Sequence, residues 1–352
     1  MISLRAVKHL LVASILGCTS LAGAAETDLT ARVTAGAQVD SNPTRDTLPN
    51  PAPDIGITAL GTVGVEHRAN RLGVKARYDL GGQQFLFDRS VQTLVQSLEA
   101  SVAFEIVPAL SVTADGSAKD RRGADHPYSD LNGGVRLSLD LDPHGSVFVR
   151  AGAERFIFRE DPPAGFQFSF ATIDVSGGAQ YRFDRHHLLR FQLGYEPRRY
   201  NSRAMSGPTT SVPNQGRRDS VLAAVAAYSY RGPFQLTLSY GYDGEDSNSF
   251  GESVYRHRVT LLLGVHLPWS VTLLGQANYQ NASYPGDVYL SDQVSLLQDD
   301  ETTNSVSAKV SRPLSRRLDL ELRGAFYDAA LPRNRLHYQR WVAGAGLTFR
   351  WP

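Results

Sequence analysis

The sequence predicts an all-β protein, a transmembrane antiparallel up-and-down β-barrel of about sixteen strands. Two patterns predict this fold class. Apolar and polar side chains alternate with a period of two in short segments from Leu29 to Trp351, which is typical of strands with one apolar and one polar face. The connections between these segments are alternately short and long, as in barrels with short turns on one side of a membrane and long loops on the other.

The N-terminal segment has the pattern of a secretory signal peptide. Arg5, Lys8 and His9 precede a largely apolar run at 10–16, and small residues follow up to Ala24, which is the order of regions in such leaders. We predict cleavage after Ala24. Residues 1–24 are then the signal peptide, and residues 25–352 form the barrel.

The single cysteine, Cys18, lies inside this leader. Residues 15–18 are similar to a lipobox, so an acylated Cys18 is the alternative to cleavage after Ala24. After that cleavage the mature chain has no thiol and no disulfide. Beyond the leader, no stretch reaches the roughly eighteen apolar residues that suggest a transmembrane helix. The 36 basic and 35 acidic residues nearly cancel, so we predict no nucleic-acid partner.

Three segments show the strand pattern most plainly. In 29–39, apolar Leu29, Val33 and Val39 alternate with a face that carries Arg32 and Gln38. In 72–80, Leu72, Val74, Ala76, Tyr78 and Leu80 alternate with Gly73, Lys75, Arg77 and Asp79. In 318–327, Leu318, Leu320 and Leu322 alternate with Asp319, Glu321 and Arg323. Each segment therefore predicts one strand with one apolar face.

The same pattern places all the strands in order. They are expected at 29–39, 55–67, 72–80, 94–106, 110–118, 131–141, 147–157, 172–183, 188–196, 221–230, 234–242, 255–267, 271–280, 303–311, 318–327 and 338–351. Only 221–230 has an ambiguous register, because alanines occupy both of its faces. The even strand count puts both termini on the side of the short turns, which is the periplasm in bacterial barrels.

The connections then follow from the strand boundaries. Short turns are expected at 69–71, 107–109, 142–145, 184–187, 231–233, 268–270 and 312–317. Long loops are expected at 40–54, 81–93, 119–130, 158–171, 197–220, 243–254, 281–302 and 328–337.

The charged face of each strand is predicted to line the lumen. Arg or Lys at the bilayer midplane of a barrel costs about 2–4 kcal/mol, so these side chains must point away from lipid. The candidates for lining the lumen and setting selectivity are Arg32, Lys75, Arg77, Asp79, Arg136, Arg150, Glu154, Arg182, Arg190, Arg256, Arg258 and Arg323. Most are expected to pair with opposite charges on neighbouring strands.

On this register the aromatic residues fall into two bands at the membrane interfaces. The outer band contains Tyr78, Tyr195, Tyr240, Tyr242, Tyr255, Tyr279 and Phe326. The inner band contains Phe104, Tyr181, Phe183, Tyr228, Tyr230, Trp269, Phe349 and Trp351.

The end of the chain resembles the C-terminal recognition signal of bacterial outer-membrane proteins. The residues that carry this resemblance are Gly346, Phe349 and Trp351, which in that family deliver the last strand to the barrel-assembly machinery. Gly344 and Pro352 depart from the usual pattern. The resemblance implies an outer-membrane location, with lipid, lipopolysaccharide and the assembly machinery as partners.

A second resemblance lies at the end of the first strand. Residues 36–45 contain Asp40, Ser41 and Asn42 and look like the "DSN" stretch that opens many porin-like barrels encoded beside exopolysaccharide export systems. The same residues are also favoured in a simple polar turn. The resemblance implies a polar channel for hydrophilic solutes or for polysaccharide export, with export components as partners. The alternative is a non-conducting scaffold or surface receptor plugged by loops 197–220 and 281–302.

The chain shows no pattern of an enzyme or a cofactor site. His257 and His266 fall on opposite faces of one strand, and His67, His126 and His337 lie near loops without an identifiable partner. The acidic runs 243–246 and 299–301 are more typical of solvated loop tips than of a calcium site. We therefore predict no catalytic residue, metal or cofactor.

Overall fold

The computed structural model describes residues 25–45, 51–123, 127–159, 168–207, 210–283, 285, 304–331 and 336–351. In this part of the chain, sixteen strands are present, one for each strand that the sequence predicts. The predicted leader 1–24 with Cys18, and also His126 and the acidic run 299–301, lie outside the described residues.

The strands follow one another with no other large element between them. They are β1 (Ala25–Asp40), β2 (Asp54–Ala69), β3 (Leu72–Phe85), β4 (Thr93–Val107), β5 (Leu110–Gly123), β6 (Tyr128–Asp140), β7 (Gly145–Phe158), β8 (Phe170–Arg182), β9 (His187–Met205), β10 (Ser211–Arg231), β11 (Phe234–Ser247), β12 (Val254–Leu267), β13 (Val271–Ser283), β14 (Asn304–Pro313), β15 (Leu318–Leu331) and β16 (Leu336–Trp351). Two short 3-10 turns, Arg89–Val91 and Pro268–Ser270, complete the described elements.

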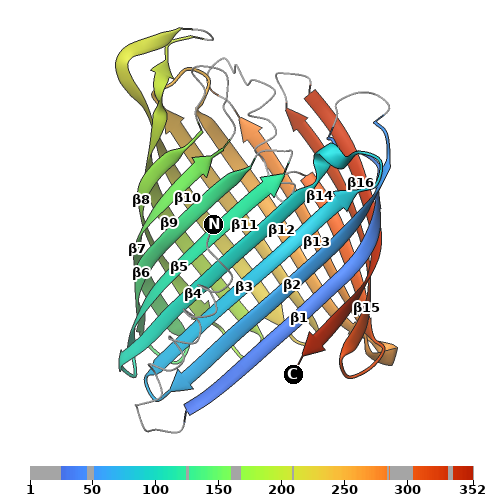
Figure 1. Cartoon of the computed structure of the whole chain (residues 1–352). Helices are drawn as coiled ribbons and strands as arrows, with labels where there is room; N and C mark the ends of the chain where they lie inside the picture. Colours follow the sequence, from blue (N-terminus) through green and yellow to red (C-terminus); the bar gives the residue numbers. More distant parts are fainter. Residues whose placement is uncertain are drawn as a thin grey trace, which may run out of the picture.

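The sheet is a closed antiparallel barrel (Figure 1). Each strand pairs with its neighbours in the sequence, and β1 pairs with β16 to close the ring. Ala31 lies opposite Trp351 in this last pair, so the chain enters and leaves the barrel at the same end. The all-β up-and-down barrel predicted from the alternation is therefore confirmed.

The apolar residues lie on the outside of the barrel. Residues directly opposite each other share a face of the sheet, and the pairs Val33–Gly61 and Gly61–Leu80 carry the outward face from β1 to β3. Leu29 is 58% exposed and Ile173 is 67% exposed on this face. Apolar surface of this extent is typical of contact with a membrane or a partner rather than with water.

Several strands continue beyond the segments that the alternation predicts. The predicted loop 197–220 is wrong in its bounds, because β9 runs on to Met205 and β10 begins at Ser211. Figure 1 shows this pair rising beyond the neighbouring strands. The run 243–246 is also strand, since β11 ends at Ser247. An extension that leaves the apolar layer no longer needs an apolar face, so the period-two signal ends before the hydrogen-bonded ladder does.

The register that alanines left open is fixed by pairing. In β10, Tyr228 lies opposite Leu189 of β9, and Leu222 lies opposite Tyr195. These partners are exposed on the outer face, so Ala224 and Ala226 also point outward. Tyr228 and Tyr230 therefore lie on the face where the sequence places them.

The short turns are held by aspartate side chains. Asp184 accepts hydrogen bonds from the backbone amides of His186 and His187 at 2.7 and 2.9 Å. These donors lower the pKa of the Asp184 carboxyl below its usual range. Asp142 accepts in the same way from His144 and Gly145. Such short turns join antiparallel strands without an intervening element.

None of the described helical segments is long or apolar enough to cross a membrane.

Candidate functional site

The candidate site is the inner wall of the barrel, and all the sequence-predicted lumenal residues project from it. The register puts on this face Arg32, Lys75, Arg77, Asp79, Arg136, Arg150, Glu154, Arg182, Arg190, Arg256, Arg258 and Arg323. Pairing around the closed ring fixes the face of the sheet from which these side chains project.

Near the short-turn end of the barrel, two basic residues of β3 pair with acids. Lys75 Nζ lies 3.2 Å from Glu66 of β2, and Arg77 Nε lies 2.8 Å from Asp79 two positions along its own strand. Glu66, Lys75 and Arg77, with Glu99 of β4, line a recess of about 540 Å³ that extends to Asn132 of β6. This recess in the wall is polar and carries charges of both signs.

Arg150 of β7 reaches across a neighbouring strand. Its guanidinium lies 2.9 Å from Asp115 of β5 and 2.8 Å from Asp174 of β8. To contact β5, the side chain passes over β6 at Gly134, where an added Cβ would lie 2.6 Å from the Arg150 Nη2. A glycine at this position therefore permits an ion pair between strands that are not neighbours.

A second cluster joins the first and last strands. The Arg32 guanidinium lies 2.8 Å from Glu321 of β15, and Lys309 Nζ of β14 lies 3.6 Å from the same carboxylate. The Thr348 hydroxyl of β16 donates to Glu321 at 2.9 Å. Glu321 thus links four strands, which include both members of the closing pair.

Higher in the lumen, Arg323 of β15 extends toward β1 and β2. It donates to the Gln38 side chain and, at 3.3 Å, to the Thr58 hydroxyl. Together with Gln83 and Gln235 it lines a recess of about 680 Å³. These recess residues come from β1, β3, β11 and β15, so this space is bordered by strands from different parts of the barrel.

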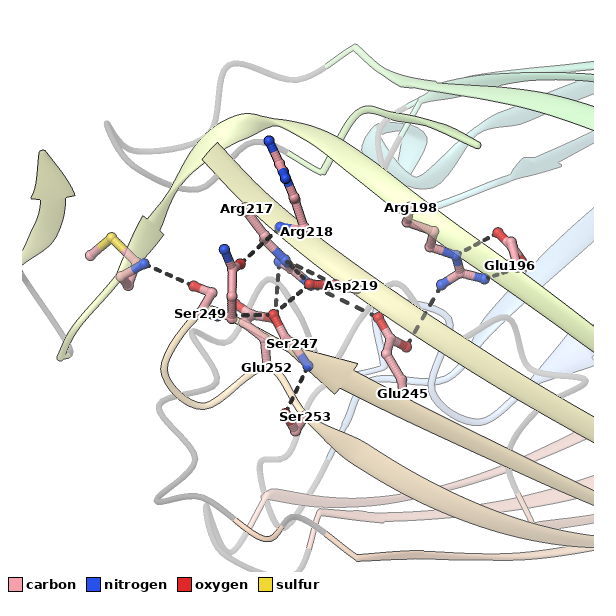
Figure 2. Close-up of polar contacts among 12 residues, drawn as sticks. Glu196, Arg198, Arg217, Arg218, Asp219, Glu245, Ser247, Ser249, Glu252 and Ser253 are labelled. Carbon is pink, nitrogen blue, oxygen red and sulfur yellow. Dashed lines mark hydrogen bonds and ion pairs between the residues drawn. The ribbon is translucent and has the colours of Figure 1, made fainter. Parts of the chain in front are cut away.

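At the outer end, acids of β9 and β11 bracket a buried arginine. Figure 2 shows Arg198 between Glu196 and Glu245. Its guanidinium lies 2.6 Å from Glu196 and 3.7 Å from Glu245. Arg256 of β12 lies 3.7 Å from Glu245 as well. Arg217 of β10 lies 4.0 Å from Glu245 too, so Glu245 accepts ion pairs from three strands.

The same network continues through Arg217 of β10 (Figure 2). Its guanidinium lies 2.6 Å from Asp219 and 3.1 Å from Glu252, which lies between β11 and β12. Asp219 is only 2% exposed and Arg217 only 7%. Burial raises the pKa of the Glu252 carboxyl, although Arg217 opposes this shift. Arg217 and Asp219 are not among the predicted site residues, because both fall in the predicted loop 197–220.

A second ion pair that the sequence did not predict lies at the outer end of the seam, which is the pairing of β1 with β16. The Arg340 guanidinium of β16 lies 2.7 Å from the Asp40 carboxylate, which is fully buried. Asp40 also accepts from the Asn42 backbone amide at 3.1 Å. All three residues of the "DSN" stretch thus contact the last strand, since Ser41 Oγ accepts from the Trp341 amide and Asn42 Nδ2 donates to the Gln339 carbonyl oxygen.

Four of the predicted arginines, Arg136, Arg182, Arg190 and Arg323, have no ion pair with a carboxylate among the described residues. Arg136 stacks over the Phe148 ring at 4.3 Å, whereas Arg182 and Arg190 have no acidic side chain within ion-pair distance in the described part of the chain. Glu154 and Arg136 line a recess of about 420 Å³. Arg136, Arg182 and Arg190 lie on β6, β8 and β9 in the half of the wall near the short turns, so this arc carries positive charge without an ion-pair partner among the described residues.

The inner wall also carries a row of aromatic rings that the sequence analysis did not identify. Tyr128, Phe156, Phe170 and Tyr200 follow one another on β6 to β9 with centroid distances of 5.2, 5.5 and 5.3 Å. The Arg217 guanidinium lies 4.0 Å from the Tyr200 ring centroid at the end of the row. The first three rings stack on one another at interplanar angles of 30° and 16°, and Tyr200 is tilted by 47° against Phe170, so neighbouring rings cover much of the ring faces in this row. Three of these residues fall in segments predicted as loops.

The three residues that resemble an assembly signal lie in β16. Phe349 and Trp351 point outward, with centroids 5.3 Å apart. Gly346 lies opposite Gly36 of β1 on the inner face. These three residues therefore lie at the closing seam, where β16 pairs with β1.

Three of the described histidines each contact one polar side chain, which is a tyrosine, a threonine or an aspartate. On the outer face, His257 and the Tyr240 hydroxyl form a hydrogen bond of 2.7 Å, and His337 lies 2.6 Å from Asp328. His266 points inward and contacts Thr272. Within the described ranges, no group of three or more His, Cys, Asp or Glu residues is arranged to hold a metal ion.

Comparison with known proteins identifies related folds only. No family model matches the chain, and no curated protein matches it. Among solved structures, the chain is similar to OprB from Pseudomonas putida, with a TM-score of 0.51 and 11% identity over 92% of this chain and 94% of that one. The chain has the fold of a bacterial outer-membrane channel.

Two other similar structures have lower scores. A bacterial polysaccharide outer membrane secretin has a TM-score of 0.44 and 10% identity, over 92% of this chain and 98% of that one. The outer membrane channel DcaP of Acinetobacter baumannii has a TM-score of 0.41 and 9% identity, over 93% and 97% of the two chains.

Proposed function

We propose that this protein is a passive, non-enzymatic outer-membrane channel for hydrophilic solutes. The observation that carries the proposal is the division of side chains across one closed sheet. The outer face is apolar and exposed, while the inner face carries arginines, lysines and carboxylates around polar recesses. Charged side chains need water or partners, and a barrel of sixteen strands is wide enough to leave an aqueous passage.

The proposal includes export and assembly. Residues 1–24 would direct the chain across the inner membrane and be removed. Gly346, Phe349 and Trp351 would then present the last strand to the barrel-assembly machinery. Outer-membrane lipid and lipopolysaccharide would surround the apolar outer face.

We further propose a preference for anionic solutes. Arg136, Arg182 and Arg190 lie in one arc of the inner wall and have no ion-pair partner among the described residues. Uncompensated charge on a pore wall raises the local concentration of the opposite ion. By contrast, Arg150 and Arg32 are neutralised by neighbouring carboxylates, so we assign them a structural role.

Polysaccharide export is a weaker candidate. The "DSN" stretch suggests export components as partners, but Asp40 and Asn42 are already used in closing the seam. Neighbouring rings cover much of the ring faces in the aromatic row, whereas stacking on a sugar needs an open ring face. We therefore favour diffusion of small hydrophilic anions over passage of a glycan chain.

Planar lipid bilayers test this function. The purified protein should give stepwise ion currents, and a salt gradient should give a reversal potential that indicates anion preference. The triple variant R136A/R182A/R190A should lose most of this preference, since it removes the arc of three arginines without an ion pair. The matched variant R312A/R316A/R317A removes three exposed charges from the periplasmic end of β14 and the turn after it, and should keep it.

Two results would contradict the proposal. If the folded protein gives no current steps, the alternative of a non-conducting scaffold plugged by its own loops is correct. If the reversal potential is the same in the wild type and the R136A/R182A/R190A variant, the three arginines do not set selectivity.

A further inference from the structure

Three arginines form a row on the outer face near the long-loop end of the barrel. Arg155 of β7 lies opposite Ala171 of β8, Ala171 lies opposite Arg199 of β9, and Arg199 lies opposite Arg218 of β10. All three arginines are exposed. Among the described residues, none of them has a carboxylate within ion-pair distance, and the nearby Asp246 instead accepts a hydrogen bond from Tyr255 at 2.6 Å.

This arrangement is unfavourable for the protein alone. Like charges directly opposite each other in a sheet repel, and Arg199 and Arg218 are such a pair. Two other outward arginines at this end are compensated, since Arg122 and Arg159 lie 2.7 and 2.6 Å from the Asp120 carboxylate. The row therefore lacks a carboxylate such as Asp120, which pairs with both Arg122 and Arg159.

The row lies just beyond the apolar belt. On the outer face of β9, Arg199 is four positions past Tyr195, which is 50% exposed. Four residues of a tilted strand rise about 10 Å. Tyrosine rings mark the interface between acyl chains and headgroups, so the Arg199 guanidinium, at the middle of the row, lies at the level of lipid headgroups.

The spacing suits an anion with two phosphates. Guanidinium groups bind phosphate oxygens in a bidentate manner, and Arg199 and Arg218 are close enough, at about 5 Å between Cα atoms, to share one phosphate. Arg155 lies two strands from Arg199, about 10 Å away, where it can reach a second phosphate. A lipid with a single phosphate would leave part of the row without a counter-charge.

We propose that Arg155, Arg199 and Arg218 form a binding site for the diphosphorylated headgroup of lipopolysaccharide in the outer leaflet. This inference rests on the proposed membrane placement and not on conductance. Binding would neutralise the repulsion within the row and anchor this side of the barrel at a fixed depth.

The test compares three proteins in detergent: wild type, R155Q/R199Q/R218Q, and the control R312Q/R316Q/R317Q. Each is titrated with diphosphoryl lipid A, with dephosphorylated lipid A and with inorganic phosphate, and the apparent affinity and thermal unfolding midpoint are measured. Diphosphoryl lipid A should bind and raise the midpoint of wild type and control. The R155Q/R199Q/R218Q variant should bind it at least several-fold more weakly, and the other two probes should bind weakly to all three.

The outcomes separate cleanly. Equal binding of diphosphoryl lipid A by both triple variants, or equal binding of the dephosphorylated lipid by wild type, overturns the inference. Tighter saturation by inorganic phosphate than by lipid also overturns it, because the site would then be a soluble-anion site. Resistance of each variant to unfolding by SDS at room temperature shows that the barrel is folded. A channel that fails to conduct but binds the lipid would refute the proposed function alone.

Discussion

Gly36 and Gly346 face each other where β1 meets β16. An added Cβ on Gly36 would lie 2.5 Å from the Ala345 carbonyl oxygen, closer than side-chain atoms approach a backbone. On Gly346 it would lie 3.0 Å from the Ala35 carbonyl oxygen. At this seam, glycine thus serves close approach of two strands rather than an unusual backbone angle.

We expect Gly36→Val to destabilise the barrel by about 1–3 kcal/mol, because the new side chain forces the seam apart. Gly324→Val is the matched control, since nothing lies within 4 Å of a Cβ at that position. Urea unfolding in detergent micelles measures both. An equal effect of the two substitutions would show that the seam tolerates separation.

Arg217 is the residue on which the outer ion-pair network most depends. Arg217→Ala leaves the buried Asp219 carboxylate without its ion-pair partner, and we expect a loss of about 3–5 kcal/mol. The exposed Arg203 on the same pair of strands should tolerate alanine within about 0.5 kcal/mol. Urea unfolding again gives the values. The double variant R217A/D219A should lose less than R217A, and a larger loss would refute this account.

At the scale of one strand, the alternation should be measurable in β9. Leu193 is exposed on the outer face, and Gln192 borders a lumenal recess. We expect Leu193→Arg to destabilise the folded protein in lipid vesicles by about 2–4 kcal/mol, whereas Gln192→Arg escapes the cost of placing a charge in lipid. Equilibrium unfolding from vesicles checks the difference. If Gln192→Arg proves the more damaging, the assignment of the two faces is reversed.

The same strand shows how far the sequence predicts structure. Between 188 and 196 the apolar layer imposes a period of two, so the strand and its faces could be predicted. From Pro197 to Met205 the strand lies beyond the apolar layer, so the alternation predicts a loop there. The backbone of this segment nevertheless pairs with β10. Parity also predicts that Arg150 faces inward. It does not predict that Asp115, two strands away, is its partner, since that depends on Gly134 in between.

At the scale of the whole molecule, the strand count and the return of the chain to one end were predictable from the alternating lengths of the connections. The candidate site was predictable only as a list of inward-facing charges. Their separation into neutralised arginines such as Arg32 and unpaired ones such as Arg190 requires knowledge of contacts across the ring. The row formed by Arg155, Arg199 and Arg218 likewise arises from three segments that are distant in the sequence.

The closing seam has a consequence for biogenesis. Asp40 and Arg340 are 300 positions apart, so the contacts between β1 and β16 are the least local in the molecule. Such contacts form late and slowly during folding. Until the last strand arrives, the free edge of β1 exposes unpaired backbone groups that can join another chain. On the proposed route of export, the polypeptide must therefore be kept from aggregating until its final residues are available.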